Sequence, residues 1–68
     1  MNTYTRWLDT KNRLWICLSR YGKTDDELKT FKPSTLVMLC VPEEKSYEMD
    51  YDKVMKTIAA GNFKQVIN

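Results

Sequence analysis

Residues able to perform acid–base or nucleophilic chemistry are few in this chain. It contains no histidine, which removes the commonest general base and the Ser-His and Cys-His nucleophilic pairs. The densest group of carboxylates could act as an acid–base pair or hold a cation, and it consists of Glu43, Glu44, Glu48, Asp50 and Asp52. These acids flank expected helix starts, where the helix dipole favours negative charge. We therefore expect no enzymatic activity, no metal and no cofactor.

The two cysteines, Cys17 and Cys40, lie inside apolar runs. A single pair without a disulfide-dense framework is typical of a reducing compartment. We expect both to be free and buried, and a disulfide stays open as the alternative if adjacent strands bring the thiols together. Without histidine or a Cys-x-x-C spacing, a zinc site is not expected. The sequence shows neither a signal peptide nor an apolar run of about 20 residues, so we expect a cytoplasmic protein and no membrane partner.

Tryptophan and arginine, which dominate the energetics of many protein interfaces, gather near the N-terminus. The segment 6–20 holds both tryptophans and three arginines. Through residue 32 the chain has seven basic and four acidic residues, and after it four basic and five acidic ones. Such a mild asymmetry can mark a contact face. The candidate partner-binding residues are Arg6, Trp7, Arg13, Trp15 and Arg20.

Two runs rich in aromatic and aliphatic residues flank turn formers at 9–12, which predicts a β-hairpin. A three-residue loop at 10–12, with Asn12 in the left-handed conformation, would place Trp7 opposite Trp15 and Leu8 opposite Leu14. One face would then carry Thr3, Thr5, Trp7, Trp15 and Cys17, and the other Leu8, Leu14, Ile16 and Leu18, with Tyr4 and Arg6 at its open end. We favour this register.

A loop one residue shorter or longer flips one strand relative to the other. Trp7 would then join the aliphatic residues, and Arg6, Arg13 and Trp15 would share the opposite face. In both registers at least one tryptophan lies on the face away from the aliphatic residues. If the helices cover the aliphatic face, that tryptophan is exposed.

Four further elements are expected. A capping box at Thr24–Glu27 predicts a helix that must end before Pro33. The apolar run 35–41 predicts a strand in the middle of the sheet, buried on both faces. The apolar stripe in 51–59, with Asp50 as N-cap and Gly61 after the end, predicts an amphipathic helix, which alternatively begins at Pro42. The final segment 63–68 is a candidate edge strand.

The order β-β-α-β-α-(β) predicts one small α+β domain over residues 1–68. Its architecture would be a single-layer antiparallel or mixed sheet, formed by a β-hairpin and a central strand, with two helices mainly on one face. A chain of 68 residues buries only about 60% of its unfolded surface. Stability is thus expected to be marginal, and self-association as a homodimer is one means of support.

Without catalytic residues, we expect a small protein-binding module that inhibits or regulates another protein. Very short intracellular proteins of this kind include accessory proteins of phages and mobile elements that act on a host factor. The alternative is a module that binds RNA or single-stranded nucleic acid, stacking bases on the exposed aromatic residues beside Arg6, Arg13 and Arg20. The net charge of +2 is small for a dedicated nucleic-acid-binding protein.

Overall fold

The computed structural model describes residues 4–67, so Thr3 and the other terminal residues lie outside it. Its elements are β1 (Thr5–Leu8), β2 (Leu14–Cys17), the 3-10 helix η1 (Leu18–Arg20), α1 (Asp25–Thr30), β3 (Thr35–Cys40), β4 (Lys45–Asp50), α2 (Tyr51–Ala59) and β5 (Lys64–Gln65). The strands form one five-stranded sheet in the order β4-β3-β2-β1-β5, and every neighbouring pair is antiparallel. The expected α+β class, with a single-layer sheet and two helices, is confirmed.

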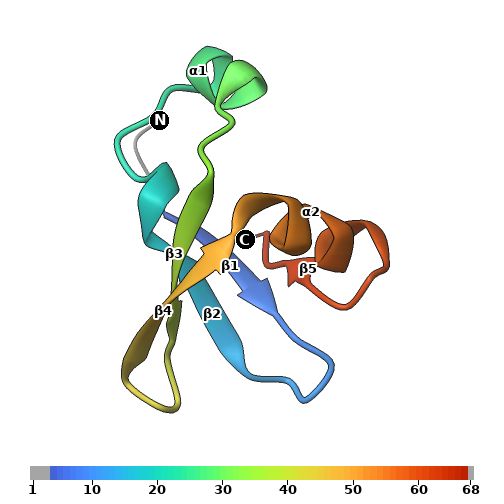
Figure 1. The fold of residues 1–68 in the computed structure, drawn as a ribbon. Coiled ribbons are helices and arrows are strands. Elements are labelled where there is room, and N and C mark those ends of the chain that lie inside the picture. Colours follow the sequence, from blue (N-terminus) through green and yellow to red (C-terminus); the bar gives the residue numbers. More distant parts are fainter. Residues whose placement is uncertain (1–3, 68) are drawn as a thin grey trace.

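One helix covers one face of the sheet. Figure 1 shows α2 beside the strands and α1 beyond the end of β3, far from α2. α2 packs on β3 and β4, and α1 contributes no buried residue. Within residues 4–67, neither α1 nor α2 is therefore packed over the other face of the sheet, and only the short η1 contacts β3 near its start.

The first hairpin has the favoured register. Trp7 pairs with Trp15 and Leu8 with Leu14. The amide of Asn12 donates to the carbonyl of Asp9, at 3.0 Å, and Asn12 has φ of 61°. A short polar side chain tolerates this left-handed conformation, so the turn residues fix which side chains share a face.

The helix boundaries follow their caps. In α1, the hydroxyl of Thr24 accepts a hydrogen bond from the amide of Glu27 at 3.2 Å. In α2, the carboxylate of Asp50 accepts from the amide of Lys53 at 3.1 Å. Beyond α2, the amide of Gly61 donates to the carbonyl of Ile58, which is one of the bonds of a Schellman C-cap.

Residues 41–50 differ from expectation, because α2 does not begin at Pro42. Instead, the amide of Glu44 donates to the carbonyl of Val41 at 3.1 Å, and Glu44 has φ of 52°. This turn folds the chain back, so that 45–50 forms the edge strand β4 against β3. The alternation in β4 of apolar Tyr47 and Met49 with polar residues is the period typical of a strand.

The core lies between α2 and the covered face of the sheet. Its buried side chains are those of Trp7, Trp15, Cys17, Leu36, Met38, Cys40, Val54 and Phe63. In β3 only alternate residues are fully buried, so this strand is interior in the sheet but not buried on both faces. No helix in the part of the chain that the structure describes is both long and apolar enough to cross a membrane.

Candidate functional site

Both tryptophans belong to the core. Trp7 is 8% exposed and Trp15 is 6% exposed, so the expectation that at least one indole is presented to solvent is wrong. The two rings do lie on the face away from the aliphatic residues, as predicted. The error concerns which face the helix covers: α2 packs over the tryptophan side. The larger aromatic side chains bury more apolar area there than the aliphatic ones would, which favours this choice.

The indole nitrogens are satisfied within the hairpin. Trp7 Nε1 donates to Thr5 Oγ1 at 3.1 Å, and Trp15 Nε1 donates to Asp9 Oδ2 at 2.9 Å. The ring of Trp15 lies edge-on to Phe63, with 5.8 Å between the ring centroids. The ring contacts and hydrogen bonds of Trp15 are thus those of a packed core residue rather than of a ligand-binding platform.

Arg13 belongs to a polar network that joins the two hairpins. Its Nε donates to Asp9 Oδ2 at 2.7 Å, and its guanidinium also reaches Glu43 Oε2 at 3.2 Å. The other oxygen of Glu43 accepts a hydrogen bond from the hydroxyl of Tyr47 at 2.6 Å. Asp9 and Arg13 come from the first loop, whereas Glu43 and Tyr47 come from the β3–β4 hairpin. The network therefore fixes the relative position of the two loops.

Asp9 is the centre of this network. Burial favours its neutral form, but hydrogen bonds from Trp15, Arg13 and Lys11 outweigh burial and hold the pKa of the carboxyl well below its ordinary range. The hydrogen bond to Glu43 raises the pKa of Tyr47. Both side chains keep the protonation state that the network needs at neutral pH, which indicates a structural role.

The remaining candidate arginines lie elsewhere. Arg6 pairs with Ile16, on the side of the sheet away from the tryptophans. Arg20 ends η1, and its Nε is buried without a hydrogen-bond partner among the described residues. The structure thus separates the five predicted partner-binding residues: Trp7 and Trp15 are in the core, Arg13 lies in the loop network, and Arg6 and Arg20 lie apart from them.

The cysteines are free and buried. Burial raises the pKa of the Cys17 thiol, and the nearby Arg20 only partly offsets this effect. A buried neutral thiol is a poor nucleophile. Within residues 4–67, no cluster of histidine, cysteine and carboxylate side chains could hold a metal ion.

The second face of the sheet, which we call the open face, is mainly aliphatic. Strand alternation and register assign to it Leu8, Leu14, Ile16, Val37, Leu39 and Val41, together with Arg6, Thr35, Ser46, Glu48, Asp50 and Lys64. Leu8 is 37% exposed and Val41 is 36% exposed. The other four aliphatic residues are half-buried by their own neighbours. At one end of this face, exposed Tyr4 stacks on Tyr21 with 4.2 Å between the ring centroids.

The sequence contained a signal for this face. Val37 and Leu39 alternate with the fully buried Leu36, Met38 and Cys40. In a continuous apolar run, however, no polar residues mark this alternation, so the run by itself predicts a strand buried on both faces. Which face stays open depends on the position of α2, which the run does not indicate.

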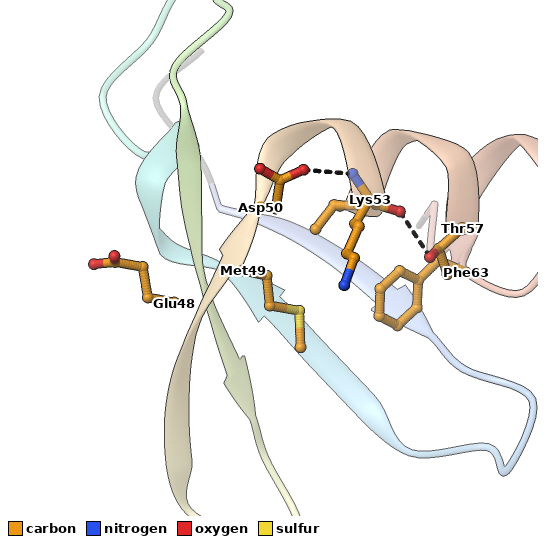
Figure 2. Close-up of a pocket in the computed structure, with 7 residues that line it drawn as sticks. Glu48, Met49, Asp50, Lys53, Thr57 and Phe63 are labelled. Atoms are coloured by element: carbon orange, nitrogen blue, oxygen red, sulfur yellow. Dashed lines mark hydrogen bonds between the residues drawn. The ribbon is translucent and has the colours of Figure 1, made fainter.

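A groove of about 420 Å³ lies between α2 and the edge strand β4. Figure 2 shows Met49, Lys53 and Phe63 around it, with Glu48 pointing away. Thr57 Oγ1 donates to the carbonyl of Lys53 at 2.8 Å, so this hydroxyl is used within the helix, whereas the side chain of Lys53 points into the groove. The groove holds no convergent set of catalytic groups, and the open face remains the better candidate for binding.

Comparisons of the chain with models of protein families, with curated proteins and with solved structures find no match.

Proposed function

We propose that this protein is a non-catalytic protein-binding module that docks through its open face and thereby inhibits or regulates another protein in a reducing cytoplasm. The observation that carries the proposal is the uncovered aliphatic surface of β1, β2 and β3. Contiguous exposed apolar surface of this kind is typical of interaction sites. The free cysteines Cys17 and Cys40 agree with the proposed compartment.

The chemistry of the open face favours a protein as partner. Its centre presents the branched side chains of Ile16, Val37 and Leu39, which pack well against apolar side chains and offer no flat ring for a base. The alternative of a nucleic-acid-binding module requires exposed aromatic residues that can stack on bases. Both indoles are buried, and the exposed rings of Tyr4 and Tyr21 at one end of the face stack on each other. The partner should therefore present an apolar surface with a polar rim.

Substitution in the open face tests this proposal. Leu39→Lys places a charge at the centre of the face, and Ala59→Lys adds the same charge at an exposed position of α2. Both variants should keep the circular dichroism spectrum of the wild type. In pull-downs from the native host, a protein retained by the wild type and by Ala59→Lys should be lost with Leu39→Lys.

Two results would reject the proposal. One is retention of the same proteins by all three baits, which would place binding outside the open face. The other is tight, salt-sensitive binding of a single-stranded oligonucleotide by the wild type, since a steep loss of affinity with salt is the signature of phosphate contacts.

A further inference from the structure

We propose that the open face binds a second copy of this chain, so that two sheets pack face to face around a two-fold axis. This inference rests on the proposed function, because it names a partner for the same face. Self-association would then compete with binding to a regulated protein, because only the monomer leaves its open face accessible. The charges of the face, its extent and its symmetry together lead to this partner.

Charge is segregated across the open face. Basic side chains lie on the side of β1 and β5, where Arg6 and Lys64 are found. The acidic residues Glu48 and Asp50 lie on β4 at the opposite edge. Between them, β2 presents only aliphatic side chains to this face, and β3 presents Val37 and Leu39 at its centre and Thr35 at one end. The face therefore runs from basic through apolar to acidic.

A two-fold axis makes this pattern complementary to itself. If the axis runs parallel to the strands through β2, the β4 strand of one copy lies over the β1 and β5 strands of the other. Glu48 of each copy then faces the basic side of its partner, and the aliphatic centres meet. An axis perpendicular to the strands would place β4 over β4 and oppose like charges, so the first arrangement is favoured.

The geometry of such a dimer is that of an aligned β-sandwich, in which two sheets pack about 10 Å apart. The two aliphatic layers would form its interior. The packing would also shield Leu8 and Val41, which are the aliphatic residues most exposed in the single copy.

The extent of the face predicts weak association. Five strands spaced about 4.8 Å apart, with about six residues in the longest, span roughly 20 Å by 20 Å, or about 400 Å² as a flat patch. A stable interface of standard size buries about 800 Å² on each partner. We therefore expect a concentration-dependent dimer of micromolar or weaker affinity rather than an obligate one.

Sedimentation equilibrium of the full chain over a wide range of concentrations tests the proposal. The average mass should rise from 8.1 kDa towards twice that value. Leu39→Lys should abolish the rise. Glu48→Lys should weaken association at least tenfold, because it places a positive charge opposite the basic side of the other copy. The matched change Asp52→Lys on α2 should leave the affinity unchanged.

The charge arrangement has its own test. The register places Arg6 one two-residue step along the strands from the level of Glu48. Arg6→Glu alone should therefore also weaken association, but the double variant Glu48→Lys with Arg6→Glu restores opposite charges across the axis and should recover most of the wild-type affinity. An affinity in the double variant no better than in the single variants would refute the two-fold arrangement.

A mass of 8.1 kDa at every concentration would overturn the second copy as partner. This outcome is separable from failure of the proposed function. A monomeric chain that still loses a captured protein through Leu39→Lys would keep the open face as a binding site for a different protein.

Discussion

Replacing Asp9 by asparagine should destabilise this protein strongly, although the change is nearly isosteric. The carboxylate accepts four hydrogen bonds. An asparagine oxygen can still accept from the amides of Lys11 and Arg13. Its amino group, however, would face two donors, the Nε of Arg13 and the indole of Trp15, and can bond to neither.

The loss can be estimated from these two bonds. A hydrogen bond to a charged group contributes about 1.5–3 kcal/mol, and the share of Arg13 must be reduced because its side chain is 36% exposed. We expect Asp9→Asn to lower the free energy of unfolding by about 2–3 kcal/mol. A chain of this length has only about 3–10 kcal/mol in total, so the melting temperature should fall by about 10 °C or more.

Urea unfolding followed by tryptophan fluorescence measures this change, because Trp15 reports directly on the lost bond. Asp52→Asn, at an exposed position of α2, removes the same charge and serves as the control, with an expected effect within about 0.5 kcal/mol. If Asp9→Asn unfolds within about 0.5 kcal/mol of the wild type, the Asp9 network does not stabilise the fold as described.

Three further predictions concern the same structure. Because the folded pKa of Asp9 lies below its unfolded value of about 3.9, its contribution to stability is complete above that pH and is lost as pH falls. The free energy of unfolding of the wild type should therefore decline more steeply below about pH 4 than that of Asp9→Asn. Parallel declines of the two free energies with pH would contradict this. Gly61→Ala should lower the free energy of unfolding by about 1 kcal/mol, because Gly61 has φ of +80°, although no atom crowds the new Cβ. An unchanged urea midpoint would show that the left-handed conformation of residue 61 does not require glycine. Cys17 and Cys40 should react with a thiol reagent only as fast as the protein unfolds, and rapid labelling of the native protein would show that they are accessible.

Local signals predicted the hairpin and helix boundaries well. The register of the first hairpin followed from Asn12, which tolerates the left-handed conformation, and the ends of α2 followed from Asp50 and Gly61. Each of these features depends on a few neighbouring residues. The turn before β4 was harder to recognise, because Pro42 and the acids after it suit a helix start as well as a turn.

The candidate site could not be predicted from local signals. Two apolar faces of one hairpin compete for a single covering helix, and the hairpin sequence alone does not decide the outcome. Trp7 and Trp15 have the composition of a binding hot spot, yet that composition is equally suited to a core. The decision depended on α2 and Phe63, which lie more than thirty residues further along the chain.

The position of α2 in the chain has a consequence for folding. The four strands β1 to β4 precede α2 and Phe63 in the sequence, so the strands can pair before α2 docks, and both indoles then have no cover. At that stage the sheet is apolar on both sides, which makes it prone to aggregate.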